Sequence, residues 1–304
     1  MRIKGTALRK IRDFFEWLID IRPSRETIRQ WTNEIGKEYK NDRTKTSGSG
    51  IYSYDEQYLN IDGKKHYRLC LKDVVTEKTV NERIVDDLTK HNIKRFIIDS
   101  LNGKEVSVIV TDGDPQYDNI LKEVAREFGI DKILHQLCTF HALKNLSKAI
   151  SKSVKSIKNR NLGYTTNYND LKNSMKLIFN LDDEKMIEKY LNRLSKGHQK
   201  RFSEIIQNEN ESMKEKARTI FEYFNGRDYH KHISNQIDWM DKNWNKLTNF
   251  YQSKDIPKTN NAVEQHFSNT NPELVKRGFK NKDSLENHLF AIASYHNKKL
   301  SLKS

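Results

Sequence analysis

Asp112 is the acidic residue whose position most strongly suggests chemistry. It follows the β-branched run Val106–Val110 and Thr111, and a carboxylate at the end of a buried strand costs free energy unless a cation or a proton compensates its charge. The alternative role, a helix N-cap, fits Asp114 better because Pro115 comes directly after it. We therefore expect Asp112 to face the end of a sheet, where open α/β sheets bind ligands.

Asp55 is the first partner that the sequence offers to Asp112. It lies within a strand-like run, Ile51–Ile61, that is rich in β-branched and aromatic residues. If this strand neighbours the one that precedes Asp112, the two carboxylates can share a cation, and two hard oxygen donors suit Mg²⁺. Asp55 could instead be an exposed strand residue, with Asp62 or Asp73 as the partner of Asp112.

The segments around these two acids predict an α/β core. Strand signals cover residues 51–61, 66–73, 79–85, 106–110 and 133–137, and helical signals cover 86–101 and the stretch from Asp114 to Gly129. The order βββαβαβ indicates a mixed sheet with flanking helices, in which the fourth strand runs parallel to the first. From Cys138 to about Ser253 the apolar residues recur at helical spacing, which predicts a helical insertion. Two further helices, 260–270 and 284–297, follow it.

The first 44 residues predict a helix-turn-helix. Leu8–Ile19 has the spacing of an amphipathic helix, and Ser24 is a plausible N-cap for a second helix that ends near Gly36. One face of the second helix carries Ile28, Trp31 and Ile35. Its other faces carry side chains of the types that read bases in the major groove, namely Arg25, Arg29, Gln30 and Asn33. An ordinary helical hairpin with solvated charges is the alternative, and residues 45–50, KTSGSG, are typical of a linker.

Three stretches in this order resemble the catalytic blocks of the DDE transposases of insertion sequences. They are YDEQYLNIDGKKHYRLCLKD, VIVTDGDPQY and TNNAVEQHF, the last followed by a terminal helix. The likeness is strongest to the Mutator-like group, whose catalytic domain has an RNase H-like fold with a C-x-x-H motif and a helical insertion. CTFH at Cys138–His141 matches that motif. The resemblance covers roughly residues 50 to 298, and the leading helix-turn-helix resembles the end-binding segment of such enzymes.

The resemblance implies that Asp55, Asp112 and Glu264 are the three catalytic acids and that together they bind two Mg²⁺ or Mn²⁺ ions. Val263 and Phe267, four residues apart, can pack on the sheet and leave Glu264 pointing to its edge. A surface glutamate at 264, with Glu273 or Glu286 as the third acid, is the alternative. A helical insertion explains the long separation of 264 − 112 = 152 residues, because loop-closure entropy grows only logarithmically with length.

Three further residues belong to the motifs that carry the resemblance. The C-x-x-H match implies that His141 orients the active site or contacts DNA and that Cys138 is a small buried residue. A structural zinc site is not favoured, since zinc needs four ligands and the sequence has no second pair of this kind. His266, beside Glu264, could be a proton shuttle, a phosphate contact or an ordinary surface histidine.

These features divide the chain into five parts: a helix-turn-helix at 1–44, a linker at 45–50, the first part of an RNase H-like core at 51–146, a helical insertion at 147–256, and the last part of the core, with the third acid, at 257–304.

Composition and charge point to a polyanionic partner. The 304 residues include 55 Lys and Arg against 41 Asp and Glu, a net charge of +14, and nucleic acid is the leading candidate. Basic clusters that could contact phosphates include Lys144 and Lys148 in one segment and Arg277 and Lys280 in another. Two cysteines cannot form a disulfide framework, and no apolar run approaches the roughly 20 residues that cross a bilayer. We expect a soluble, cytoplasmic prokaryotic protein associated with the nucleoid.

The sequence therefore predicts a DNA transposase that cleaves and joins strands with metal ions. We expect it to bind double-stranded DNA at the ends of an element and to act as a homodimer or larger assembly. A transposon-derived DNA-binding protein without cleavage activity and an RNase H-like nuclease or resolvase are the alternatives.

Overall fold

The centre of the fold is a mixed five-stranded sheet. A computed structural model describes residues 8–42, 48–159, 168–270, 279 and 281–302. The strands are β1 (Gly50–Ile61), β2 (Lys64–Asp73), β3 (Thr79–Val85), β4 (Val106–Thr111) and β5 (Leu134–Leu137), in the order β3-β2-β1-β4-β5. β1 pairs antiparallel with β2 and parallel with β4. The mixed sheet with flanking helices and the parallel pairing of the first and fourth strands are therefore confirmed.

The β1–β2 hairpin follows from its turn residues. Asp62 and Gly63 both have positive φ, 51° and 79°, the conformation that suits a two-residue turn between twisted antiparallel strands. This tight turn sets the register in which Asp55 lies opposite Cys70. Residues directly opposite each other in a sheet point to the same face, so Asp55 and Cys70 share one face of the sheet.

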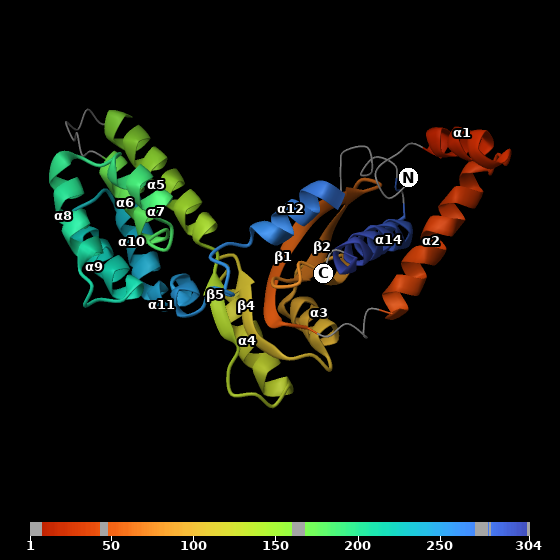
Figure 1. The fold of residues 1–304 in the computed structure, drawn as a ribbon, viewed down its shortest axis with the longest axis horizontal. Helices are drawn as coiled ribbons and strands as arrows, with labels where there is room; N and C mark the ends of the chain where they lie inside the picture. The colour runs from red at the N-terminus through yellow and green to blue at the C-terminus, as the bar shows by residue number, and fades with distance from the viewer. Residues whose placement is uncertain (1–7, 43–47, 160–167, 271–278, 280, 303–304) are drawn as a thin grey trace. The chain divides into compact units, whose positions relative to one another are not determined.

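Helices cover both faces of the sheet (Figure 1). On one face, helices α3 (Lys90–Leu101) and α4 (Gln116–Glu127) pack in a core that includes Tyr52 and Tyr54 of β1. On the other face, α12 (Asn261–Thr270) packs on Cys70, and α14 (Lys282–Ser301) packs near the β1–β2 turn against Leu59 and Ile61. This alternation along β1 leaves Asp55, between Tyr54 and Glu56, on the face covered by α12.

Helix α14 also covers the edge of the sheet that β3 forms. β3 is an edge strand, and unpaired backbone groups on such a strand invite pairing with other chains. The Asn297 side chain accepts from the Thr79 N–H at 3.0 Å and donates to the Thr79 carbonyl at 2.8 Å, and Glu286 accepts from the Ile84 N–H at 3.0 Å. Two side chains of α14 thus satisfy the edge of β3.

The amino-terminal helices are α1 (Leu8–Ile19) and α2 (Arg25–Asp42), and α2 packs along α14 (Figure 1). The sequence predicted that the second helix ends near Gly36. This is wrong, because α2 continues for six residues beyond Gly36. A Cβ on Gly36 would stand 2.0 Å from the backbone oxygen of Asn287 in α14. Glycine at this position therefore allows the two helices to approach closely.

This close approach changes which face of α2 is buried. Ile28 and Thr32 are buried as Gly36 is, but Trp31 and Ile35 are 42% and 44% exposed. The apolar face formed by Ile28, Trp31 and Ile35 is therefore buried only at Ile28. The helix turns its small residues toward α14, because close packing requires small side chains between the two backbones.

The chain divides into two compact units, the first made of residues 1–135 and 260–304 and the second of residues 136–259. The described part of the second unit is helical after β5. Its elements are α5 (Thr139–Asn159), α6 (Tyr168–Ile178), α7 (Glu184–Leu191), α8 (Lys196–Gln207), α9 (Met213–Asn225), α10 (Lys231–Lys242), α11 (Trp244–Leu247) and a 3-10 helix, η3 (Asn249–Gln252).

An aromatic core holds the second unit together. Phe221 packs against Trp244 with ring centroids 4.7 Å apart, and Phe202 and Phe224 are buried in the same unit. The sequence placed the helical insertion at 147–256, but the unit begins at Gln136. It begins earlier because β5 leads into α5 after a single residue, Cys138. Among the described helices, none is long and apolar enough to span a membrane.

Candidate active site

Asp55 and Asp112 occupy matched positions on neighbouring parallel strands. The last paired residues of β1 and β4 are Ser53 and Val110, and each aspartate follows its strand's paired residue by two positions. Neighbouring strands lie about 4.8 Å apart, so this register brings the two carboxylates to the same level at the carboxyl end of β4. Both side chains are partly exposed there.

Helix α12 carries Glu264 to the same face of the sheet. Val263 and Phe267 pack on Cys70, the residue directly opposite Asp55, as their spacing predicts. Just before the helix, the buried Asn260 side chain donates a 2.9 Å hydrogen bond to the carbonyl of Tyr54. Because Tyr54 precedes Asp55 in β1, this bond fixes the start of α12 beside the first aspartate.

The electrostatics of Asp55 reflect this arrangement. Burial raises the pKa of Asp55 from its ordinary value to about 8, and the negative charges of Glu56, Asp112 and Glu264 add to the increase. Among the described residues, neither Asp55 nor Asp112 forms an ion pair with a lysine, arginine or histidine. Two neighbouring aspartates, hard oxygen donors that have no such ion pair, fit a divalent ion such as Mg²⁺.

Asp112 has a structural role that the sequence did not indicate. One of its carboxylate oxygens accepts the N–H of Asp114 at 3.0 Å, while Asp114 in turn accepts the N–H of Gln116 at 3.0 Å. Both aspartates thus organise the turn into α4. The sequence predicted that Asp114 takes this role and leaves Asp112 free, but Asp112 also accepts a hydrogen bond in the turn. A carboxylate has about four acceptor positions, so Asp112 keeps the capacity to bind a cation.

The other acids that the sequence offered lie elsewhere. Asp62 is in the exposed β1–β2 turn. Asp73 is buried and accepts hydrogen bonds from Ser49 and from the Thr76 N–H. Glu286 caps the edge strand, and Glu273 lies outside the described residues. Each described alternative therefore has another position or another partner.

Glu56 is a further carboxylate near this end of the sheet that sequence reasoning missed. It accepts hydrogen bonds from the hydroxyls of Tyr54 at 2.8 Å and Tyr117 at 2.6 Å. Burial raises its pKa although these hydrogen bonds oppose the change, and the charge of Asp112 contributes to the increase. Its two-residue spacing from Tyr54, on the face of β1 that is buried under α4, was the signal that could have found it.

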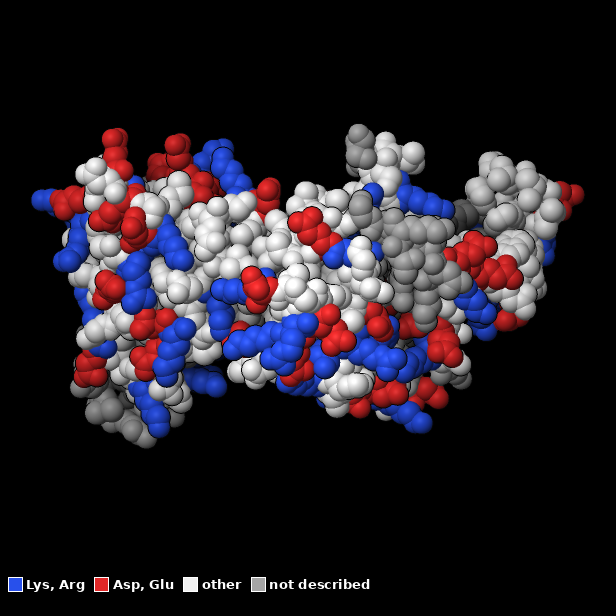
Figure 2. All heavy atoms as spheres, turned by 90° about the horizontal axis from the view of Figure 1, so that it is seen from below, with Lys and Arg blue, Asp and Glu red and all other residues white. Residues whose placement is uncertain are grey.

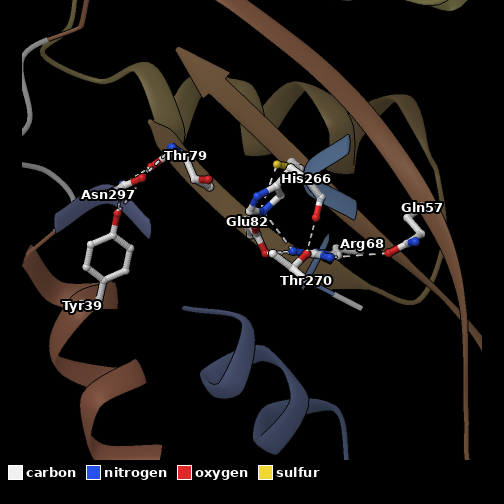
Figure 3. A network of polar contacts seen from close by, with 9 residues as sticks. Tyr39, Gln57, Arg68, Thr79, Glu82, His266, Thr270 and Asn297 are labelled. Carbon is white, nitrogen blue, oxygen red and sulfur yellow. Dashed lines mark hydrogen bonds and ion pairs between the residues drawn. The ribbon is translucent and has the colours of Figure 1, made fainter. Parts of the chain in front are cut away.

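A buried polar network fastens α12 to the sheet (Figure 3). Arg68 of β2 is fully buried and donates to Glu82 of β3 through Nε at 3.0 Å and Nη2 at 2.6 Å. His266 of α12 contacts the other oxygen of Glu82, and its Nε2 lies 3.1 Å from Arg68 Nη2. The Arg68 guanidinium also lies over the ring of Phe267, 5.1 Å from its centroid. The network thus joins β2, β3 and α12, and its member in α12, His266, is two residues from Glu264 in the sequence.

The charges in this network are well defined. Burial alone raises the pKa of Glu82, but Arg68 and His266 outweigh it and lower the pKa to about 2. Burial lowers the pKa of His266. His266 is 5% exposed, so the alternative of an ordinary surface histidine is wrong.

Cys70, Glu82 and His266 place three ligand atoms within 4.8 Å of one another. A metal ion requires a negative or neutral set of ligands with room for the cation. Here the Arg68 guanidinium already neutralises Glu82. We therefore interpret these residues as part of the structural network around the ion pair of Arg68 and Glu82, and not as a metal centre.

The C-x-x-H residues lie in the second unit, at the start of α5. Cys138 is buried, and His141 is in the first turn of the helix, with its ring 5.8 Å from that of Phe140. Lys144 and Lys148 follow on the exposed side of α5. Their spacing of four places them in one stripe along the helix.

Of the expected DNA-contacting residues in α2, Arg25, Arg29 and Gln30 are exposed and Asn33 is half-buried. Arg29 forms an exposed ion pair with Glu26 at 3.1 Å. Arg277 and Lys280 lie outside the described residues. Figure 2 shows basic and acidic side chains interspersed over one face, so the net charge of +14 does not gather there in a single patch.

Comparison with known proteins identifies relatives of this chain. Residues 4–269 match the family described as the transposase IS66 family. A protein of Methanobrevibacter smithii, described as an uncharacterized 48.3 kDa protein of insertion element ISM1, is 28% identical over 308 residues, which cover 100% of this chain and 67% of that protein. A solved structure described as the Mos1 transposase catalytic domain and Raltegravir with Mg is 13% identical and covers 74% of this chain and 94% of that one. Its TM-score of 0.24 does not establish a common fold.

Proposed function

Because the chain belongs to the transposase IS66 family, we propose that it cleaves and joins DNA strands when an insertion sequence moves, with Asp55, Asp112 and Glu264 as the catalytic acids. The observation that carries this proposal is the matched register of Asp55 and Asp112, together with the bond from Asn260 to Tyr54 that holds the start of α12 beside them. The likeness to the Mutator-like group depends only on the CTFH motif and the helical segment.

The three carboxylates, Asp55, Asp112 and Glu264, would together hold two Mg²⁺ or Mn²⁺ ions. Ions held in this way supply stabilisation of the charge on the attacking and the leaving oxygen of a phosphodiester. The protein's own part is to position the acids, through the register of β1 and β4 and the packing of Val263 and Phe267. Asp55 would have to be deprotonated to hold a cation, since metal ligands bind in their deprotonated form.

The strand order supports an RNase H-like core. Three antiparallel strands, followed by β4 parallel to β1 and by β5, form one sheet with helices on both faces. In this core, Asp55 lies in the central strand β1 and Asp112 follows its parallel neighbour. The helical segment joins β5 to α12, so it interrupts the chain between the second and third acids.

We further propose that the two amino-terminal helices recognise element ends as a helix-turn-helix and that the protein acts as a dimer or larger assembly, since two ends must meet. The exposed Arg25, Arg29 and Gln30 of α2 support the first proposal. Phosphate contacts from Lys144 and Lys148 would add affinity that falls with salt. As the motif implies, His141 would contact DNA or orient the active site, and Cys138 would be a small buried residue rather than a zinc ligand.

The test of the proposal is Glu264→Gln. Because this change removes a metal ligand without altering the shape of the side chain, we expect DNA binding close to that of the wild type and cleavage of end-bearing DNA lowered by several orders of magnitude. Binding is measured by a mobility shift and cleavage by strand nicking in Mg²⁺. The control is Glu127→Gln on the exposed surface of α4, which should change neither.

Two results would change the interpretation. An equal loss of binding and cleavage would make Glu264 a structural residue. A wild-type protein that binds element ends and never cuts them in Mg²⁺ or Mn²⁺ would be a DNA-binding relative without nuclease activity.

A further inference from the structure

A cavity of about 380 Å³ lies on the side of α12 that faces away from Glu264. Its walls come from β2, the segment between β2 and β3, α12 and α14, all within the first compact unit. The residues that line it on α12 include Ala262, Gln265 and Asn269, which follow one another at helical spacing, while Glu264 lies on a different face of the helix. The volume is within the range of small-ligand sites.

The lining of this cavity is rich in positive charge. Lys72 of β2 and Lys299 of α14 both line it, as do His296 and His266. Among the described residues, neither lysine has a carboxylate partner within ion-pair distance. Glu77, between β2 and β3, is the single acid among the lining residues. Two lysines without partners beside two imidazoles make an environment suited to an anion.

The pKa of His296 is affected by the charges around the cavity. Burial lowers its pKa first, and the positive charges of His266, Lys72 and Lys299 lower it further, although Glu82 opposes the change. The lysines of β2 and α14 therefore act on His296 across the cavity. An anion placed among them would relieve this repulsion.

Lys72 connects the cavity to the face of the sheet that carries Asp55. Lys72 is opposite Ser53 in the β1–β2 pair, two positions from the pair formed by Asp55 and Cys70. Two residues along a strand span about 7 Å, and the same two-residue step keeps Lys72 on the α12 face of the sheet. Helix α12, which packs on Cys70, lies between Asp55 and the cavity. DNA that reaches both would therefore pass over this helix.

We propose that this cavity binds a phosphate group of the bound DNA, on the other side of α12 from the phosphodiester that is cut, through Lys72 and Lys299. The proposal rests on the proposed function, because it assumes that DNA lies along this face of the sheet. The exposed amide side chain of Asn269, which also lines the cavity, would donate to the same phosphate or its sugar.

The test is the salt dependence of DNA binding by a Lys72→Ala, Lys299→Ala double variant. The probe is a fluorescent end-bearing duplex. Removing one lysine that pairs with a phosphate lowers the slope of log affinity against log salt by about one. We expect the slope to become shallower by about one to two, and binding at about 0.1 M salt to weaken about 10- to 100-fold. The matched control is Lys298→Ala, an exposed neighbour on α14 that does not line the cavity.

A second variant tests the cavity itself without removing charge. Asn269→Trp places a large ring in the space while both lysines remain, so it should also weaken binding. Probes with a 5′-phosphate and a 5′-hydroxyl distinguish the source of the ligand. Equal losses on both probes indicate an internal phosphate, and a loss confined to the phosphorylated probe indicates a terminal one.

An unchanged slope in the double variant would overturn the proposal, as would a decrease matched by Lys298→Ala, which would mean that any nearby charge has this effect. These outcomes differ from a failure of the proposed function, in which the wild-type protein itself would not bind or cut the same duplex.

Discussion

At the scale of single residues, the main finding is that one carboxylate, Asp55, is held in conditions that disfavour its charge. The causes are burial and the nearby Glu56, Asp112 and Glu264. A protein keeps such a group when a bound cation or a proton compensates it. Asp55 therefore couples the stability of the protein to pH and, under the proposed function, to divalent metal.

This coupling predicts the direction of a pH effect. The pKa of Asp55 is about 8 in the folded protein and ordinary in the unfolded chain, so the unfolded chain ionises first and folding loses stability as pH rises from about 4 to about 8. In EDTA, Asp55→Asn should raise the Tm near pH 8 and leave it little changed near pH 4. Millimolar Mg²⁺ should raise the wild-type Tm but not that of the variant.

Scanning calorimetry measures both effects, and Asp62→Asn, in the exposed β1–β2 turn, is the control. If Asp55→Asn and the wild type showed the same pH dependence without metal, Asp55 would not be the coupled group.

At the scale of elements, the position of α12 depends on interactions with three strands. The helix is held by the bond from Asn260 to β1, by Val263 and Phe267 on β2, and by His266 on Glu82 of β3. A helix of ten residues has little stability of its own. The geometry at Glu264 is therefore a property of the sheet rather than of the helix.

The ion pair within this network can be measured by a double-mutant cycle. Arg68→Met or Glu82→Leu alone leaves a buried charge without its partner, and each should lower the free energy of unfolding by about 3–5 kcal/mol. The double variant should lose less than the two single losses combined. Denaturant unfolding of the four proteins gives the coupling energy.

The matched control is the half-exposed pair Arg83 and Asp99, 2.9 Å apart, for which a coupling of at most about 1 kcal/mol is expected. A buried pair that coupled no more strongly than this surface pair would contradict the proposed role of the network.

At the scale of the whole molecule, the parts proposed for recognition and for chemistry come from different segments of the chain. The acids are in the sheet and α12, and the proposed base-reading residues are in α2, which packs on α14. The helical unit adds an exposed stripe of lysines on α5. Sequence preference and cleavage should therefore be separable by mutation.

Replacing both Arg25 and Arg29 with Ala tests this separation. We expect the preference for element-end DNA over random duplex to decrease by about 1–3 kcal/mol for each base that is no longer read, while cleavage of the DNA that still binds continues. Competition binding measures the preference, and Arg126→Ala on α4, an exposed arginine, is the control. An unchanged preference would move recognition to another part of the chain.

Local pattern was sufficient for much of the fold. β3 begins and ends at the predicted residues, Thr79 and Val85, and α1 at Leu8 and Ile19, because alternation and helical spacing are recorded in consecutive residues. The packing face of α12 also followed from such a pattern, which depends on neighbours in sequence. The parallel pairing of β1 with β4 joins distant residues and was inferred from the order of the elements.

The remaining features depend on residues far apart in the chain. Arg68, Glu82 and His266 meet across 198 residues, Gly36 is required by the backbone of Asn287, and Glu56 is held by Tyr117 of α4. No local period marks such partners. Each side chain is compatible with many surroundings, and its environment is set by which elements pack together, since the free energy of burial and ion pairing depends on atoms brought together in space.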